Sequence, residues 1–115
     1  MKNLTLENIA AVTAGTYHGD EGKKHLEVSS IEIDSRKVQP GGLFVAIKGE
    51  RVDGHNFIKQ VIDGGALAAI SEHELPGSDF PYIQVKSSLQ AVKDIAEFYL
   101  KQLHIPVVGI TGSVG

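Results

Sequence analysis

The stretch PGGLFVAIKGERVDGHNFIKQVID, residues 40–63, decides how this chain folds. A Pro-Gly-Gly turn leads into residues 43–47, a continuous apolar run typical of a strand buried on both faces. A polar loop bounded by glycine follows over residues 48–54, and residues 55–63 carry apolar side chains at helical spacing. The order strand, loop, helix predicts one unit of an α/β domain.

The same alternation of strands and helices continues on both sides of this stretch. We expect helices over 6–13, capped by Thr5, and from Ser87 to about residue 103, with Gln90 where a capping box needs it. The expected strands cover residues 16–18, 25–35, 67–71, 82–85 and, after Pro106, 106–110. In the strand over 25–35, alternation places Ile31, Ile33 and Ser35 on one face. Together these elements predict a layered α/β domain with a mixed sheet.

Composition excludes several classes of function. The 115 residues are 42% hydrophobic, enough for a single core, and carry a net charge of −3, which argues against nucleic-acid binding. The chain has no cysteine, so disulfides, thiolate catalysis and cysteine-ligated zinc are excluded. Its histidines show no short metal-binding spacing, and we expect no metal site. Without a signal peptide or a membrane-length apolar run, we expect a soluble cytoplasmic protein with no membrane insertion.

The first candidate site follows the strand expected over 25–35. The hydroxyl of Ser35 and the guanidinium of Arg36 suit a diphosphate, because arginine presents paired donors that match phosphate oxygens. The alternative is that Asp34 and Arg36, which share a face, simply pair in solvent for ~0–1 kcal/mol.

The second candidate site is the loop over residues 48–54. Ligands of α/β domains usually bind in loops at the carboxyl ends of strands. Gly49 and Gly54 permit backbone geometries that turn amides toward a ligand, and Lys48 and Arg51 add positive charge beside a helix N-terminus. The alternative is that Asp53 caps the helix while the charged side chains face water.

The third candidate site lies at residues 107–115, where an apolar run leads into TGSVG. Small residues after a strand let backbone N–H groups converge on an anion, so this sequence predicts the first half of a phosphate-binding loop. The lysine and the magnesium ligand of such a loop are expected beyond Gly115. The alternative is an ordinary junction between a strand and a turn.

Residues 34–58, with the pattern DSRKV-x-PGGLFVAIKGERVDGH-x-FI, and VVGITGSVG at residues 107–115 together resemble the Mur ligases, which extend the stem peptide of peptidoglycan. The motifs stand in the family's order and spacing, and its nucleotide loop is of the T-G-x-x-G-K type. The resemblance implies a small mixed-sheet N-terminal domain over residues 1–104, with helices packed on the sheet. It also implies that residues 105–115 begin a P-loop ATPase domain.

The resemblance also implies a division of roles. The N-terminal domain would hold the UDP end of UDP-MurNAc-peptide, while a central domain binds ATP and Mg²⁺. The residues expected to contact the UDP precursor are Ser35, Arg36, Gly49, Glu50, Arg51 and Val52. Those expected to shape the loop are Asp53, Gly54 and His55, and those expected to contact ATP are Thr111, Gly112, Ser113 and Gly115. No catalytic residue is expected within these 115 residues.

In the family's reaction, ATP phosphorylates the peptide carboxylate, and an incoming amine attacks the acyl phosphate. The triplets Gly49-Glu50-Arg51 and Thr111-Gly112-Ser113 resemble the branch that adds D-alanyl-D-alanine to UDP-MurNAc-tripeptide. The branch that adds the third stem residue is the alternative within the family. A non-catalytic nucleotide-binding module is the alternative outside it. By itself, this chain is expected to be inactive as a ligase.

Overall fold

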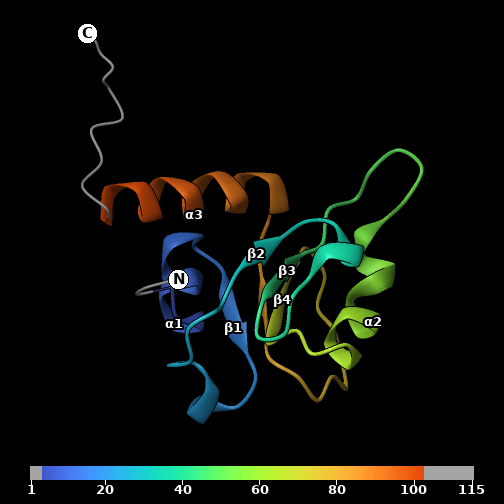
Figure 1. Cartoon of the computed structure of the whole chain (residues 1–115), viewed down its shortest axis with the longest axis horizontal. Coiled ribbons are helices and arrows are strands. Elements are labelled where there is room, and N and C mark those ends of the chain that lie inside the picture. The colour runs from blue at the N-terminus through green and yellow to red at the C-terminus, as the bar shows by residue number, and fades with distance from the viewer. Residues whose placement is uncertain (1–3, 103–115) are drawn as a thin grey trace, which may run out of the picture.

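The computed structural model describes residues 4–102 (Figure 1). Its α-helices are α1 (Leu6–Val12), α2 (Ile58–Asp63) and α3 (Ser88–Gln102). Its strands are β1 (Thr16–His18), β2 (Ile31–Glu32), β3 (Leu43–Val45), β4 (Ala68–Ser71) and β5 (Tyr82–Gln84). Three 3₁₀ turns complete the described part, η1 (Glu21–Lys23), η2 (Ser35–Lys37) and η3 (Gly54–Phe57).

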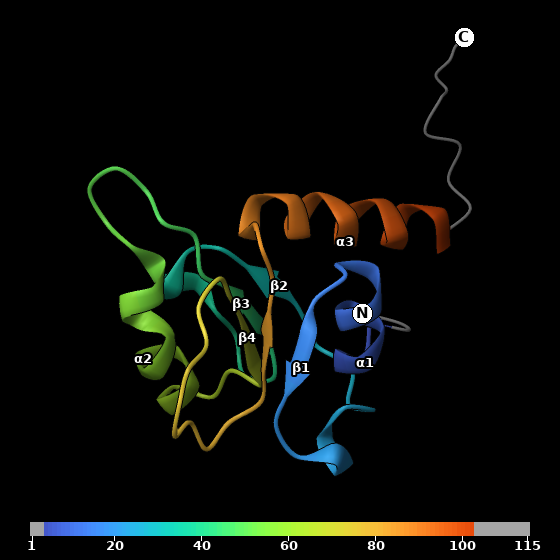
Figure 2. The same ribbon diagram turned by 180° about the vertical axis from the view of Figure 1, so that it is seen from behind.

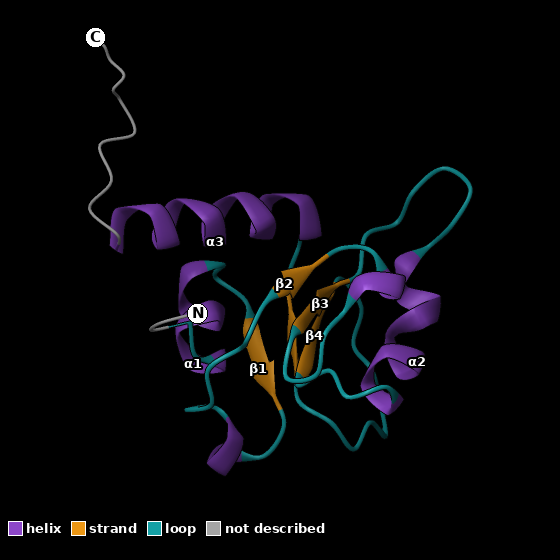
Figure 3. Ribbon diagram, viewed as in Figure 1, coloured by secondary structure: helices purple, strands orange, loops and turns teal. Residues whose placement is uncertain are grey.

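The described strands form one sheet in the order β1-β5-β4-β3-β2. Figure 3 shows strands of this sheet, in orange, between the helices. Strand β1 pairs antiparallel with β5, whereas β2, β3, β4 and β5 run parallel to one another. The mixed sheet predicted from sequence is therefore confirmed. Its four parallel strands bring the loops that follow β2 and β3 to the same edge.

Helices cover both faces of the sheet, with α1 and α3 on one face and α2 on the other (Figures 1 and 2). Strand β3 contributes side chains to the cores on both faces of the sheet, because successive side chains of a strand point to opposite faces. Leu43 and Val45 join the core under α1 and α3, while Phe44 joins the core under α2. The uninterrupted apolar run predicted a doubly buried strand, and the structure confirms it.

Helix α1 begins as predicted. The side chain of Thr5 accepts a hydrogen bond from the backbone N–H of Asn8 at 3.1 Å, which satisfies one free donor of the first turn. After the helix, Gly15 passes so close to β5 that a Cβ there would lie 2.7 Å from Cγ2 of Ile83. No larger residue fits where the chain turns from α1 into β1.

Helix α3 packs through only part of its apolar face. Ser87 accepts from the N–H of Gln90 as expected, but the Gln90 side chain bonds to Asp94 instead of closing a capping box. Leu89 is 61% exposed, whereas Ala91 and Ile95 are buried. The helix therefore rests on the sheet through the stripe that contains Ile95, and Leu89 lies outside that stripe.

The strand expected over 25–35 is reduced to β2. One carboxylate oxygen of Glu32 accepts the N–H groups of Ile33 and Asp34, which draws the chain out of the ladder. Ile33 lies beyond the end of β2 and is 56% exposed, so the predicted strand was too long. The helix expected over 55–63 also differs, because it opens with η3 before α2 begins.

Other predictions concern residues that the structure does not describe. The final strand, the boundary between residues 104 and 105, and the ATP-loop residues Thr111, Gly112, Ser113 and Gly115 lie outside residues 4–102. Among the described helices, none combines the length and the apolar character needed to cross a bilayer.

Candidate ligand-binding cleft

A cleft of about 550 Å³ opens where the segments after β2 and β3 meet. Its walls combine apolar side chains with a few polar groups, contributed by both segments and by α2 and η3. The lining residues are Ile33, Asp34, Ser35, Arg36, Phe44, Ile47, Gly49, Val52, Gly54, Phe57 and Gln60. Both internal candidate sites of the sequence therefore contribute to one cavity.

The position of the cleft follows from the sheet. Strands β2 and β3 are parallel neighbours, so the chain leaves both at the same edge. It continues after β2 into η2 and after β3 into the loop of residues 48–54, which projects beside η2 and α2 in Figure 1. Open α/β sheets usually bind ligands at this edge.

Arg36 reaches the cleft while it is held by Asp34. The two carboxylate oxygens of Asp34 accept from Nε and Nη2 of Arg36 at 3.1 and 3.0 Å, and one also accepts the Arg36 backbone N–H. The Arg36 side-chain hydrogen bond, followed by the backbone bond, lowers the pKa of Asp34 to about 2. The pairing that the sequence offered as an alternative is therefore present, and Arg36 lines the cleft nonetheless.

The loop over residues 48–54 is a tight hairpin, called here the cleft hairpin. The backbones of Lys48 and Asp53 form an isolated antiparallel bridge. The N–H of Gly49 donates to the carbonyl of Val52 and the N–H of Gly54 donates to the carbonyl of Ile47, both at 2.9 Å. A Cβ on Gly54 would lie 2.9 Å from the backbone nitrogen of Ile47, so only glycine fits there. The hairpin is thus closed at its base, with Glu50 and Arg51 at its tip.

The structure separates the residues predicted for the two internal sites by whether they line the cleft. Ser35, Arg36, Gly49, Val52 and Gly54 line the cleft. Glu50 and Arg51 are exposed at the hairpin tip and do not line it. Within residues 4–102, the backbone N–H groups of these two tip residues donate to no other group, so both remain available to a ligand.

Asp53 and His55 lie at the base of the hairpin, where they bond to each other. Oδ1 of Asp53 accepts from the His55 backbone N–H at 2.9 Å and lies 2.7 Å from Nδ1 of the His55 ring. Asp53 therefore caps η3, as the sequence allowed. The backbone bond from His55, followed by the ring contact, lowers the pKa of Asp53.

Sequence reasoning missed other residues of the site. Phe44, Ile47 and Phe57 were predicted as packing residues and also form apolar cleft wall, and Gln60 adds a polar group from α2. Glu72, just after β4, donates its backbone N–H to Nε2 of His55 at 2.9 Å. That contact spans 17 positions in sequence, and no local pattern indicates it.

Asp53, His55 and His73 are close enough to raise the question of a metal ion, since their ligand atoms lie within 4.8 Å of one another. However, both ring nitrogens of His55 already bond to protein groups, Asp53 and the Glu72 N–H. Mg²⁺ also prefers oxygen ligands to imidazole. The cluster does not fit the magnesium ion of an ATP site.

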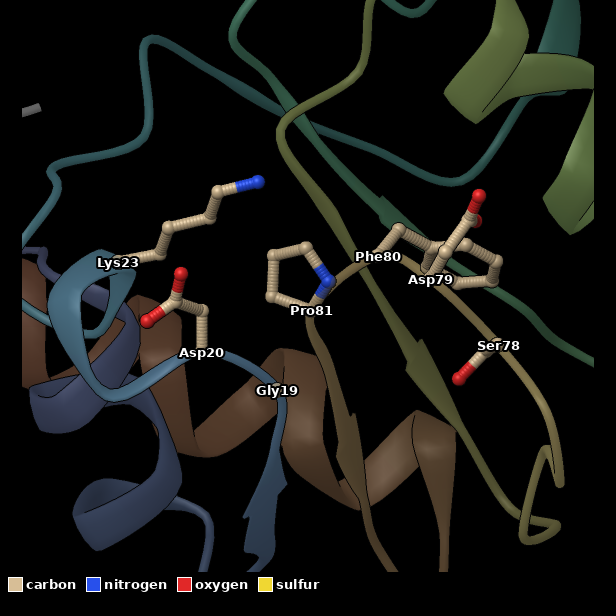
Figure 4. Close-up of a pocket in the computed structure, with 7 residues that line it drawn as sticks. All are labelled: Gly19, Asp20, Lys23, Ser78, Asp79, Phe80 and Pro81. Carbon is tan, nitrogen blue, oxygen red and sulfur yellow. The ribbon is translucent and has the colours of Figure 1, made fainter.

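A smaller cavity of about 230 Å³ lies elsewhere on the domain, between η1 and the loop before β5 (Figure 4). Its lining residues are Gly19, Asp20, Lys23, Ser78, Asp79, Phe80 and Pro81. In Figure 4, Lys23 and Asp20 extend from one wall and Pro81 lies at the other. None of the sequence-predicted site residues lines this cavity, which makes it a useful comparison for the cleft.

Comparison with known proteins gives a consistent result. The family model described as "Mur ligase family, catalytic domain" matches residues 27–109. The UDP-N-acetylmuramoyl-tripeptide--D-alanyl-D-alanine ligase of Bacillus subtilis is 33% identical over all of this chain, which spans 25% of that protein. The UDP-N-acetylmuramoyl-L-alanyl-D-glutamate--2,6-diaminopimelate ligase of Listeria monocytogenes is 41% identical over 83% of the chain, which spans 20% of that protein.

Solved structures resemble the fold as well. A crystal structure of MurF from Acinetobacter baumannii matches with a TM-score of 0.75 and 31% identity, over 85% of this chain and 21% of that one. A MurF ligase from Thermotoga maritima, in complex with ADP, matches with a TM-score of 0.58 and 36% identity, over 64% of this chain and 17% of that one. The chain therefore corresponds to about a fifth of these structures.

Proposed function

Because the chain belongs to the Mur ligase family, we propose that residues 4–102 bind the UDP end of UDP-MurNAc-tripeptide in a cytoplasmic, ATP-dependent ligase of peptidoglycan biosynthesis. The whole ligase adds D-alanyl-D-alanine to the tripeptide. Family membership supports the reaction class. The proposal for this part of the protein rests on the cleft.

The observation that carries the proposal is that residues 34–36 and the cleft hairpin share one cavity. Its volume of about 550 Å³ falls within the range usual for small-molecule sites. Ile33, Val52 and Phe57 offer apolar surface to a planar base. Ser35 and Arg36 offer hydrogen-bond donors to a diphosphate, and the amides of the hairpin tip add more.

Each part of the cleft then has a role in holding the precursor. The Ser35 hydroxyl and the Arg36 guanidinium orient the diphosphate, and the guanidinium also neutralises part of its charge. The backbone of residues 49–52 closes over the ligand from the other side, with the exposed Arg51 side chain able to add a contact. Because the net charge of the chain is −3, these local donors hold the anion without help from the overall field.

ATP and Mg²⁺ are assigned to residues beyond this domain. When bound, ATP supplies the phosphoryl group that activates the peptide carboxylate for attack by the amine of D-alanyl-D-alanine. Thr111, Gly112, Ser113 and Gly115 are the proposed ATP contacts of this chain. The role of residues 4–102 is to bind and orient the other substrate, so this chain alone is expected to turn over no ATP.

The second candidate function is the ligase that adds the third stem residue. The 41% identity to the Listeria diaminopimelate ligase supports it, although the match covers less of the chain than the Bacillus match does. Both ligases use a UDP-MurNAc-peptide. The cleft therefore supports the two proposals equally.

An assay of the full-length ligase that carries this chain separates the two. We expect phosphate release with UDP-MurNAc-tripeptide and D-alanyl-D-alanine, and none with UDP-MurNAc-L-alanyl-D-glutamate and diaminopimelate or lysine. The reverse result would assign the chain to the third-residue branch. Activity with neither pair would favour a non-catalytic nucleotide-binding module.

A further inference from the structure

His55 is bonded on both sides of its ring although it does not line the cleft. Its side chain is only 7% exposed, with Nδ1 2.7 Å from Asp53 and Nε2 2.9 Å from the backbone nitrogen of Glu72. A backbone N–H can only donate, so Nε2 must accept. The proton of the neutral ring then lies on Nδ1 and is donated to Asp53.

On one side, His55 acts on the cleft hairpin through Asp53. The same oxygen, Oδ1, accepts both the ring Nδ1–H and the backbone N–H of His55, which fixes the Asp53 side chain. The backbones of Asp53 and Lys48 form the antiparallel bridge across the base of the hairpin. The bonds from His55 that hold Asp53 therefore also hold the base from which the hairpin tip extends.

On the other side, His55 is anchored by Glu72. This residue directly follows β4, which lies at the centre of the sheet, and its carboxylate accepts the N–H of Ser88 at the start of α3 at 2.8 Å. The His73 ring packs beside His55 with ring centroids 4.5 Å apart. Glu72, which anchors His55, is thus connected to both a central strand and the longest helix of the described chain.

We propose that His55 is a positioning residue that fixes the cleft hairpin against the carboxyl end of β4, so that the hairpin tip presents its amides to the diphosphate of the UDP precursor. The inference rests on the proposed function. It adds the mechanism of positioning, in which one tautomer of His55 bridges Asp53 and the backbone of Glu72. His55 itself does not contact the ligand.

Three variants of the full 115-residue chain separate the two bonds of the ring. His55→Phe keeps the ring volume and removes both bonds. His55→Asn places an amide donor near the position of Nδ1 and lacks the acceptor for Glu72, whereas His55→Gln keeps an acceptor near Nε2 and lacks the donor to Asp53. His18→Phe is the matched control, because His18 stacks on Tyr82 at 4.6 Å in the edge strand farthest from β2.

The first readout is the tautomer. Nitrogen-15 NMR of the imidazole groups, assigned with His55→Asn, is expected to show a neutral His55 ring with its proton on Nδ1. The second readout is the binding of UDP, measured by calorimetry. We expect His55→Phe to weaken UDP binding on the order of tenfold, by analogy with the loss of metal affinity when a residue that orients a metal ligand is changed. The Asn and Gln variants should lie in between, and His18→Phe should bind as the wild type does.

In the full-length ligase, His55→Gln should raise the KM for the UDP precursor while kcat and the KM for ATP stay unchanged. A merely structural role would lower activity without this selective rise in the KM for the UDP precursor. An Nε2–H tautomer, or UDP binding that is unaltered in a folded His55→Phe chain, would overturn the positioning role alone. If His55→Phe does not fold, unaltered UDP binding by His55→Gln and His55→Asn would overturn the positioning role instead. A wild-type chain that binds no UDP would instead overturn the proposed function, and this inference with it.

Discussion

Asp34 holds the guanidinium of Arg36 through both carboxylate oxygens, at 3.1 Å from Nε and 3.0 Å from Nη2. A planar group held along one side keeps a fixed orientation with its remaining N–H groups pointing outward. Because Arg36 lines the cleft, the ion pair prepares the arginine for an anion even though the pair itself is exposed and contributes little to stability.

Arg36→Ala should therefore weaken UDP binding. A hydrogen bond to a charged group contributes ~1.5–3 kcal/mol, and the 86% exposure of this side chain favours the lower end, roughly a tenfold loss. Titration calorimetry measures it. Lys37→Ala removes an equal charge from the next residue, which does not line the cleft, and should have a smaller effect. Equal losses in both variants would mean that only net charge matters.

The Asp34 carboxylate should also make stability depend on pH at the acidic end. Its pKa is lowered from 3.8 to about 2 by the Arg36 side chain and then the Arg36 backbone bond. A lowered pKa in the folded state stabilises the fold above about pH 4, and this contribution is lost as the pH falls through about 2.

Urea unfolding of the wild type and Asp34→Asn at several pH values between 5 and 2 measures this contribution. The stability difference between the two proteins should be largest above about pH 4 and should shrink toward pH 2. Asp79→Asn, in the loop before β5, serves as a control for general charge effects. A difference that stays constant over the whole range would contradict the pairing with Arg36.

Gly54→Ala should destabilise the domain and disturb the cleft. The added Cβ would lie 2.9 Å from the backbone nitrogen of Ile47 and 3.1 Å from its oxygen, and backbone atoms cannot move aside as a side chain can. Overpacking of this kind costs ~1–3 kcal/mol. Gly22→Ala is the control, because its nearest neighbour would be at 3.4 Å, an ordinary contact. Chemical denaturation compares the two, and equal stability would show that the hairpin base is looser than described.

The two apolar positions Ile95 and Leu89 test the packing of α3. Ile95 is 2% exposed, so Ile95→Ala should cost ~2–5 kcal/mol of folding free energy. Leu89 is 61% exposed, and Leu89→Ala should change stability by less than ~0.5 kcal/mol. Urea denaturation measures both. A larger cost for Leu89→Ala would show that Leu89 also belongs to the buried face of α3.

Local signals in the sequence predicted most of the fold. Thr5 predicted a helix start, and the run from Leu43 predicted a strand buried on both faces, because each depends on neighbouring residues alone. The strand over 25–35 was predicted too long because alternation cannot show that a carboxylate oxygen of Glu32 accepts from the N–H groups of Ile33 and Asp34. Leu89 is exposed although it stands at helical spacing with other apolar residues of α3, because such spacing identifies a broad apolar face without showing which stripe meets the sheet.

The candidate site could be predicted only in part. Residues 34–36 and the hairpin were identified from their residue types, and parallel strands explain why they meet. The anchor at Glu72 was not foreseeable, because it uses a backbone N–H, which every residue except proline carries. Contacts of this kind depend on how β4 and α3 are placed in the fold, and no local sequence pattern shows that placement.

The central claim is that the cleft between residues 34–36 and the hairpin holds the UDP group. Amide chemical-shift mapping of the 115-residue chain during titration with UDP tests it most directly. The account predicts saturable shifts concentrated at residues 33–36 and 49–54. Shifts confined to the cavity of Figure 4, around Asp20 and Phe80, or no shifts at all, would contradict it.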